Sequence, residues 1–478
     1  MVGDTVKVKY GEASGWWVVG TMVLGSGIAF LDSSVVNVAL PRIASGLHTG
    51  IAGLQWTLDG YLLMLGSLIL TAGSLGDLFG RRKMFVVGLG IFAGASLLCG
   101  IAPNVGVLIA ARALQGAGGA MLVPQSLAII GATFEGKDQT KAVALWSGLS
   151  GVTTLFGPAL GGWLVSYSWR WIFFINLPLA AICIVMALTK VPESSDPESA
   201  RRLDIPGSLA AAGGLGGLVY MLIEGPGKGF IRASILSAGI AGGILLIAFV
   251  VIEMRSKVPM IPRDIFKSKQ FTGANLTTVL VYASLYGVSF LVTLQLQIKL
   301  HYSPLESGLA STPITVLLLL LSPYAGRLSM RFGPRLPMTV GPIVIGLGLA
   351  WLGRIRPGDH YLSGVFPAMM VFGLGLSIMV APLTAAMLAS VAKRHMGVGS
   401  AINNAVARVG GLLAIALLPA LAGVAGGTSP TNSQYSRALL IAAGWALAGG
   451  VIAFATIRTA APPESSTHTP APASSRAG

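Results

Sequence analysis

Fourteen apolar runs, each about 20 residues long, follow one another along this chain of 478 residues. About 20 apolar residues of an α-helix cross the hydrocarbon core of a bilayer, and the absence of water there forces a spanning backbone to satisfy its own hydrogen bonds. The sequence therefore predicts an all-α integral membrane protein with fourteen transmembrane helices. The predicted spans are residues 16–39, 54–76, 84–102, 105–131, 141–166, 171–191, 204–224, 231–252, 271–296, 307–328, 336–353, 361–390, 397–421 and 436–458.

The composition and the charge agree with a membrane protein. Charged residues make up 10% of the chain, whereas soluble globular proteins carry about 25%. The net charge of +15 does not indicate a nucleic-acid partner, because the basic residues fall in short loops between apolar runs. With the N-terminus inside, 22 of the 32 lysines and arginines face the cytoplasm and eight face outward. This asymmetry predicts a multi-pass protein with both termini in the cytoplasm.

An internal repeat organises the chain. The segment "GSLGDLFGRR" (73–82) follows the second span, and "GRLSMRFGPR" (326–335) follows the tenth, 253 residues later. This spacing predicts two parallel six-helix repeats with two extra helices between them, an architecture that secondary transporters use. The predicted regions are a cytoplasmic N-terminus (1–15), an N-terminal bundle (16–191), two inserted helices with cytoplasmic linkers (192–270), a C-terminal bundle (271–458) and a disordered cytoplasmic tail (459–478).

Two acidic residues, Asp32 and Asp59, lie well inside predicted spans. Each such placement costs roughly 2.5–3.5 kcal/mol on insertion scales, so an intramembrane acid usually faces a cavity or a partner. At 1.5 Å per helical residue, Asp32 and Arg112 each lie roughly 10 Å from the outer end of their spans and Asp59 roughly 8 Å. The three groups are therefore predicted to share one layer in the outer half of the membrane.

Two interpretations of this layer remain open. In the first, Asp32 takes up and releases a proton as its access to water or substrate changes, and Arg112 and Asp59 belong to the same proton-coupling site. In the second, Asp32 and Arg112 form a permanent ion pair that only fixes the packing of their helices.

The loop after the second span contains Gly73, Asp77, Gly80, Arg81 and Arg82. Asp77 ends a helix, where the helix dipole disfavours a negative charge, so it requires a nearby cation or the N-terminus of another helix. Gly80 permits a tight turn, and the arginines add positive charge on the inner side. The loop is either a latch or a topology signal alone.

The fifth span contains "GPALGG", with Gly157, Pro158, Gly161 and Gly162. Proline bends a spanning helix, and the glycines give it a face with almost no side chain. Such a helix either seals a pathway against a neighbouring helix or simply packs closely.

Polar residues on other spans are candidates for a substrate cavity. The thirteenth span contains Asn403, Asn404 and Arg408, and Arg408 lies near the membrane midplane without an obvious acidic partner in the sequence. It either faces a water-filled cavity, where it binds an anion, or has a structural hydrogen-bonding role. The other candidates are Asn37, Tyr61 and Gln115. The sequence shows no metal-ligand spacing, nucleotide-binding motif or nucleophile constellation, so we expect no cofactor, no metal and no enzymatic activity.

In order along the chain, these motifs resemble those of the major facilitator superfamily, and more closely its fourteen-helix drug:proton antiporter family of bacteria. The resemblance rests on "LDSSVVNVALP" (31–41), "GSLGDLFGRRK" (73–83), "RALQGAGGA" (112–120), "GPALGG" (157–162), "WRWIFFINLP" (169–178) and "SPLESGL" (303–309). It covers nearly the whole chain. Thr153 departs from the pattern, since the family often has glycine there.

The resemblance implies a role for each motif. Asp32 would be the proton-coupling carboxylate, and Arg112 would modulate its proton transfer. Asp77, Arg81 and Arg82 would form a cytoplasmic latch of the outward-facing state. The glycines and the proline of "GPALGG" would limit proton leak and favour exchange.

The sequence thus predicts a proton-driven exporter of small amphipathic compounds that works by alternating access. Its expected partners are the lipid bilayer, protons and a small-molecule substrate, and we expect a monomer in the bacterial cell membrane. A proton symporter that takes up a nutrient is the alternative, and a membrane sensor is disfavoured because no loop is long enough for a folded domain. Asp32 and Asp59 would suit lipophilic cations, whereas Arg112 and Arg408 would suit anions.

Overall fold

The computed structural model describes residues 9–196, 204–256, 265–391, 396–424 and 429–458, whose regular secondary structure is helical. Thirteen stretches of helix among them are long and apolar enough to cross a membrane, and α5 (Gly136–Tyr167) is a further helix of 32 residues. Each of the fourteen predicted spans corresponds to one helix or to two consecutive helices, so the predicted all-α class is confirmed. The predicted tail (459–478) lies outside the described residues.

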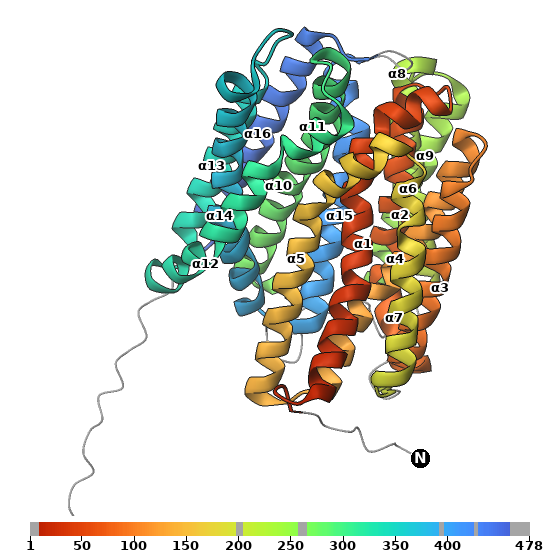
Figure 1. Ribbon diagram of the computed structural model, residues 1–478, viewed down its shortest axis with the longest axis vertical. Helices are drawn as coiled ribbons and strands as arrows, with labels where there is room; N and C mark the ends of the chain where they lie inside the picture. The colour runs from red at the N-terminus through yellow and green to blue at the C-terminus, as the bar shows by residue number, and fades with distance from the viewer. Residues whose placement is uncertain (1–8, 197–203, 257–264, 392–395, 425–428, 459–478) are drawn as a thin grey trace, which may run out of the picture.

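The helices form two bundles with a hairpin beside them (Figure 1). The N-terminal bundle contains α1 (Ala13–Gly46), α2 (Ile51–Phe79), α3 (Arg81–Gly100), α4 (Val105–Thr133), α5, α6 (Trp171–Phe174) and α7 (Asn176–Lys190). The hairpin consists of α8 (Ile205–Lys228) and α9 (Ala233–Arg255). The C-terminal bundle contains α10 (Lys269–Leu294), α11 (Pro304–Leu309), α12 (Thr312–Phe332), α13 (Arg335–Leu352), α14 (Phe366–Ala389), α15 (Met396–Leu421) and α16 (Asn432–Thr456). Short turns of other helix types cover Ile265–Lys267, Gln295–Lys299 and Tyr361–Val365.

The sixth and the tenth predicted spans are interrupted near one end, and each break lies four residues before a proline. Pro178 has no N–H to donate to the carbonyl of Phe174, which is the last residue of α6. Pro313 likewise has none for the carbonyl of Leu309, the last residue of α11. A short helix therefore precedes a longer one in the sixth and the tenth spans.

The packing of the helices repeats between the bundles. A Cβ atom added to Gly88 on α3 would lie 3.1 Å from the carbonyl oxygen of Gly118 on α4. The same atom added to Gly341 on α13 would lie 2.9 Å from the carbonyl oxygen of Gly375 on α14. Gly88 and Gly341 are 253 residues apart, the offset of the repeated loop motif. Small residues thus let equivalent helices approach closely in both repeats.

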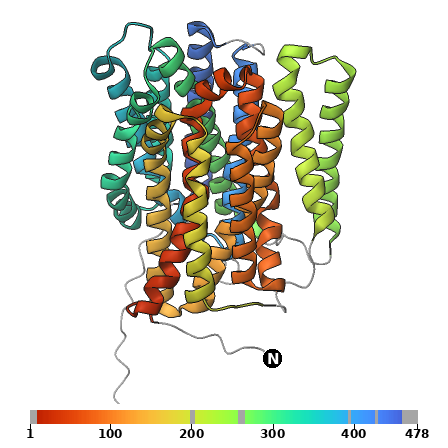
Figure 2. The same ribbon diagram turned by 45° about the vertical axis from the view of Figure 1, so that its right-hand side comes forward.

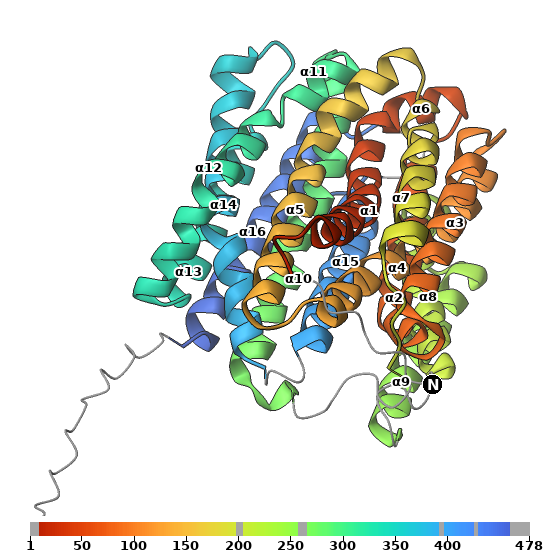
Figure 3. The ribbon, with the colours of Figure 1, turned by 60° about the horizontal axis from the view of Figure 1, so that its bottom comes forward.

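Figures 1 to 3 show where the α8–α9 hairpin and the interface between the two bundles lie. We call the end where α1 joins α2 the upper end, and the end where α2 joins α3 the lower end, as drawn in Figure 1. The α8–α9 hairpin stands at one side of the molecule in Figure 2, where α8 packs against α2 and α15. Figure 3 shows α1 and α5 next to α10 and α15 in the middle of the molecule. The hairpin therefore touches both bundles at their lateral seam.

The two bundles meet closely at the upper end. Gln55 on α2 donates from Nε2 to the carbonyl oxygen of Ile415 on α15 at 2.6 Å. Gln297, just after α10, donates from Nε2 to the carbonyl oxygen of Val38 on α1 at 2.8 Å. Helix α11 packs against α5 at the same end. The space between the bundles is consequently closed on the upper side.

Candidate functional site

Asp32 lies inside the N-terminal bundle and is fully buried. Its Oδ2 accepts a hydrogen bond from Nη1 of Arg112 at 2.5 Å, which is also an ion pair. Its Oδ1 accepts hydrogen bonds from Nε2 of Gln115 and Nδ2 of Asn176, each at 2.9 Å. The same two amide groups donate to Oγ of Ser96 at 3.3 and 3.0 Å. Side chains from α4 and α7 thus bind the carboxylate on α1, and Ser96 on α3 holds their two amides.

The guanidinium of Arg112 is held on several sides. Its Nε donates to the carbonyl oxygen of Thr57 at 3.1 Å, and its Nη1 also donates to Oε1 of Gln115 at 2.8 Å. Its central carbon lies 4.3 Å from the centre of the Tyr61 ring, a cation–π contact. The Tyr61 hydroxyl donates to the carbonyl oxygen of Ala29 at 3.1 Å, which fixes the ring. These contacts compensate the desolvation of a buried ion pair.

Asp59 does not join this network, although its predicted depth is similar. It is fully buried, and neither of its carboxylate oxygens has a hydrogen-bond partner among the described residues. It follows Gln55 by four residues and Trp56 by three, so it shares their face of α2. Gln55 bonds to α15, and Nε1 of Trp56 donates to Glu224 on α8 at 3.1 Å. Asp59 therefore lies on the face of α2 that meets α15 and α8, and it makes no hydrogen bond to the Asp32–Arg112 ion pair.

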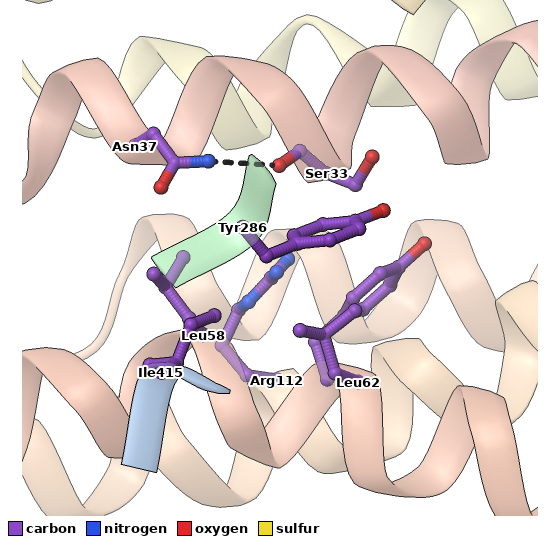
Figure 4. Close-up of a pocket in the computed structure, with 8 residues that line it drawn as sticks. Ser33, Asn37, Leu58, Leu62, Arg112, Tyr286 and Ile415 are labelled. Carbon is purple, nitrogen blue, oxygen red and sulfur yellow. Dashed lines mark hydrogen bonds between the residues drawn. The ribbon is translucent and has the colours of Figure 1, made fainter. Parts of the chain in front are cut away.

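A narrow pocket lies between the two bundles, next to the ion pair. Ser33 and Asn37 from α1, Leu58, Tyr61 and Leu62 from α2, Arg112 from α4, Tyr286 from α10 and Ile415 from α15 form its walls. Figure 4 shows Ser33 and Asn37 on one helix, opposite Leu62 and Arg112. Asn37 donates to the carbonyl oxygen of Ser33 at 3.3 Å. Asp32 does not line this pocket, so Arg112 is the member of the ion pair that reaches it.

Arg408 also lies between the bundles, on α15. Its side chain is buried, and its Nη1 donates to the hydroxyl of Tyr286, which lines the pocket. Its central carbon lies 5.6 Å from the centre of the Phe30 ring on α1 in the other bundle. No Asp or Glu of the described residues lies within 4.0 Å of its nitrogens. Arg408 therefore faces the interface between the bundles as a cation without a counter-ion.

The remaining cavity candidates divide between the pocket and the interior of the bundles. Gln115 is fully buried and binds Asp32, so it lies behind the pocket wall. Asn403 donates to Oδ1 of Asn275 at 3.1 Å and to Oγ1 of Thr278 at 2.9 Å, which places it between α10 and α15. Asn404 is partly exposed and precedes Arg408 by four residues, so these two share a face of α15. Because consecutive residues of a helix point in different directions, Asn403 and Asn404 face different surroundings.

The loop between α2 and α3 is held by an ion pair of its own and by the segment that follows α7. Asp77 accepts a hydrogen bond from Nε of Arg81 at 2.9 Å, and Nη2 of Arg81 lies 2.8 Å from the same Oδ1, so Arg81 supplies the cation that Asp77 requires. Oε2 of Glu193 lies 3.6 Å from Nε of Arg82, and the Glu193 carboxylate accepts the backbone N–H groups of Arg82 and Lys83. Gly80 has φ = +105°, a conformation that side chains disfavour. Gly73 on α2 packs beside Pro124 on α4.

The glycines of α5 sit directly on neighbouring backbones. A Cβ atom on Gly161 would lie 3.1 Å from the Cα of Val35 on α1. A Cβ atom on Gly162 would lie 2.5 Å from the carbonyl oxygen of Pro304 on α11. Gly157 faces Ser34 of α1 equally closely, and Pro158 faces Gly308 of α11. The glycine face thus packs on α1 within its own bundle and on α11 across the interface.

Thr153 departs from the glycine pattern without losing the close approach. A Cβ atom on Gly27 of α1 would lie 3.2 Å from the Thr153 methyl carbon. Gly27 on α1 therefore supplies the small residue that the family pattern often places at position 153 of α5.

Several polar partners in the site were not identified from the sequence. Asn176 lies in the quoted segment "WRWIFFINLP", but nothing local in it shows that its amide faces Asp32. Ser96 looks like any small residue of an apolar span. Glu224 was predicted at the end of a span, yet α8 continues to Lys228, whose Nζ lies 2.8 Å from Oε2 of Glu224. The signal that the sequence offered for these partners was a single polar residue within or next to an apolar run.

No group of three or more metal-ligating side chains comes together in the part of the chain that the structure describes. Cys99 and Cys183 are buried and unpaired. Cys99 contacts Oε1 of Gln115 at 3.6 Å, beside the Asp32 network.

The sequence and the fold both match known proteins. The family model described as "Major Facilitator Superfamily" matches residues 22–415 and 274–477. The chain is 34% identical over 398 residues to "Multidrug resistance protein Stp" of Mycobacterium tuberculosis, covering 83% of this chain and 73% of that protein. It is 31% identical over 407 residues to "Tetracenomycin C resistance and export protein" of Streptomyces glaucescens, covering 85% and 76%.

A solved structure with the same fold is that of a POT family transporter in complex with 5-aminolevulinic acid. The TM-score is 0.68, and the match covers 95% of this chain and 98% of that chain. The identity is 13%, so this similarity concerns the fold alone. It confirms the predicted arrangement of two six-helix bundles.

Proposed function

Because this chain belongs to the major facilitator superfamily, we propose that it is a proton-driven exporter of small amphipathic compounds that works by alternating access. The names of its relatives support this proposal, since one denotes multidrug resistance and another resistance and export. Transport without enzymatic turnover is the activity of the family. The proton gradient is the energy source, and the transporter requires no cofactor.

The observation that carries the proposal is the carboxylate of Asp32, buried inside one bundle and paired with Arg112. An ionisable group at such a position is costly, and its ionised state depends on the three donors around it. A proton added to Asp32 removes the counter-charge of Arg112. Because Arg112 also lines the pocket, a change of charge at Asp32 reaches a bound substrate through this one side chain.

In alternating access, the end of the transporter that is closed must open while the other end closes. The upper end is closed by α5 against α11 and by the hydrogen bonds of Gln55 and Gln297. The positive-inside asymmetry supports a cytoplasmic lower end and cytoplasmic termini. In this orientation the described state is closed toward the outside. Protonation of Asp32 from the outer side, after the bundles rock, would then accompany substrate release.

The loop between α2 and α3 would act at the lower end as a latch. Its described bonds are to the N-terminal bundle and to the segment that follows α7, since Asp77 holds Arg81 and Glu193 holds Arg82. The proposed outward-facing state would bring this loop against the C-terminal bundle. The glycine face of α5 would seal the closed state against proton leak. We expect a monomer in a bacterial cell membrane to perform the complete cycle.

The test uses everted membrane vesicles, whose interior is acidified by respiration, and the dyes fluorescein and rhodamine 123. We expect the wild-type protein to concentrate at least one dye inside, since uptake into everted vesicles corresponds to export. A protonophore should abolish this uptake, and Asp32→Asn should lower it at least tenfold. The exposed loop variant Asp359→Asn is the control and should transport normally. Proton-dependent uptake that survives in Asp32→Asn would exclude Asp32 as the coupling group.

A further inference from the structure

Arg408 is a buried cation whose charge the mechanism above does not use. Its side chain is 8% exposed, and it lies between Tyr286 of its own bundle and Phe30 of the other. A guanidinium has five N–H donors, and the hydroxyl of Tyr286 is its one hydrogen-bond acceptor among the described residues. Burying a charge without a counter-ion costs several kcal/mol. An ionisable residue within the membrane usually faces a partner or a functional site.

The two acids of the spans do not neutralise Arg408. Asp32 is occupied by Arg112, Gln115 and Asn176 inside the N-terminal bundle. Asp59 shares the face of α2 that meets α15 and α8, and it makes no hydrogen bond to any described residue. The pocket itself is lined by neutral side chains and by Arg112. The pocket between the bundles therefore carries the positive charge of Arg112 and no carboxylate, and no described acid forms an ion pair with Arg408.

The surroundings of Arg408 also favour an aromatic ligand. Tyr282 and Tyr286 lie one turn apart on α10, with ring centres 6.4 Å apart. Phe30 lies on the opposite bundle. Asn404 lies one turn from Arg408 on the same face of α15, and its Nδ2 donates to the carbonyl oxygen of Ser400. The planar fork of an arginine matches the two oxygens of a carboxylate better than any neutral group.

We propose that Arg408 is the binding residue for the anionic group of an aromatic substrate, either a carboxylate or an acidic oxygen of comparable charge. The substrate anion replaces the missing counter-ion of Arg408 while its rings lie among Phe30, Tyr282 and Tyr286. Lipophilic cations are disfavoured because they would add a second unpaired positive charge to the same space. This inference rests on the proposed function, since it assigns the interface between the bundles to the transport path.

The test compares two xanthene dyes of similar shape and opposite charge, fluorescein and rhodamine 123. Binding to the full-length protein is measured by fluorescence anisotropy in nanodiscs of zwitterionic lipid at pH 8, with empty nanodiscs subtracted. We expect fluorescein to bind at least tenfold more tightly than rhodamine 123. The variant Arg408→Gln should weaken fluorescein binding at least tenfold and change rhodamine 123 binding less than twofold. Arg408→Lys, which keeps the charge, should retain part of the preference.

The exposed arginine Arg437 provides the matched control, and Arg437→Gln should bind both dyes as the wild type does. Equal affinities of the wild type for the two dyes, including no measurable binding of either, overturn the inference. An unchanged preference in Arg408→Gln also overturns it. The binding assay needs no gradient, so it is independent of the vesicle assay. If fluorescein binds through Arg408 and no proton-driven uptake is seen, the proposed function fails and this inference stands.

Discussion

At the scale of single residues, the ion pair of Asp32 and Arg112 depends on its neighbours as much as on its two members. Gln115 and Asn176 donate to the carboxylate, and the carbonyl of Thr57 and the ring of Tyr61 hold the guanidinium. Removing one member of a buried pair leaves an uncompensated charge, whereas replacing both with apolar groups is often nearly neutral. The stability of the N-terminal bundle should therefore respond very differently to single and double substitutions.

We predict that Arg112→Met lowers the free energy of unfolding by about 3–5 kcal/mol. The double variant Asp32→Leu with Arg112→Met should recover most of this loss, because neither charge then remains. Reversible unfolding in mixed micelles of dodecyl maltoside and sodium dodecyl sulfate measures both values. Arg437→Met, at an exposed position, is the control. Equal stability of the single and the double variant would show that the pair contributes no coupling.

At the scale of helices, α5 is the element whose surface decides how closely the bundles approach. Gly162 lies against the backbone of α11, so any side chain at this position meets Pro304 and Leu305. Gly148 lies on the same helix with no atom of a neighbour within 4 Å of an added Cβ. The two positions share the intrinsic cost of replacing glycine in a helix, and they differ in the contact across the interface.

We predict that Gly162→Val destabilises the closed upper end by about 1–3 kcal/mol, since overpacking a tight contact costs this much. Spin labels at Tyr167→Cys and Leu362→Cys, in a chain with Cys99 and Cys183 replaced by alanine, report the distance between the bundles. The population with long distances should rise in Gly162→Val and stay unchanged in Gly148→Val. A distance distribution that is the same in both variants would contradict a sealing role for α5.

At the scale of the whole molecule, two rigid bundles are joined by few polar contacts. Gln55 and Gln297 each make a hydrogen bond between the bundles, and both lie at the upper end. Few and localised contacts allow one end to open without disrupting either core, as rocking of two repeats requires. The α8–α9 hairpin bonds to α2 through Trp56 and Glu224 and through Thr71 and Ser208, so it should move with the N-terminal bundle.

We predict that replacing both Gln55 and Gln297 with methionine shifts the molecule toward an open upper end. Each hydrogen bond contributes about 0.5–1.5 kcal/mol, so the pair should change the ratio of states by roughly five- to 150-fold. The same spin labels measure the populations. Gln270→Met removes a comparable bond to Ala386 inside the C-terminal bundle and should leave the ratio as it was. If the double variant leaves the ratio of states unchanged, the free energy that closes the upper end comes from the packing of α5 on α11 alone.

Much of the fold was predictable because membrane spans are encoded locally. A run of about 20 apolar residues specifies a helix wherever it occurs in the chain. The repeat offset of 253 residues specified two equivalent bundles, and the glycine contacts of α3–α4 and α13–α14 show the same offset. The breaks at Phe174 and Leu309 each lie four residues before a proline, Pro178 and Pro313, although the apolar runs themselves continue through both breaks.

The site was predictable only in part. Counting residues along a span predicts how deep a side chain lies in the membrane, but it does not predict the direction in which the side chain points. Asp32 and Arg112 were placed at one depth and do pair, while Asp59 at a similar depth does not join them. The sequence by itself determined the spans, the two repeats and the rare charges within the membrane. The tertiary structure alone decided which charges meet, why Asn176 binds Asp32, and why Arg408 pairs with no acid of the described residues. The physical reason is that the rotation of each helix is set by close packing against helices distant in the chain.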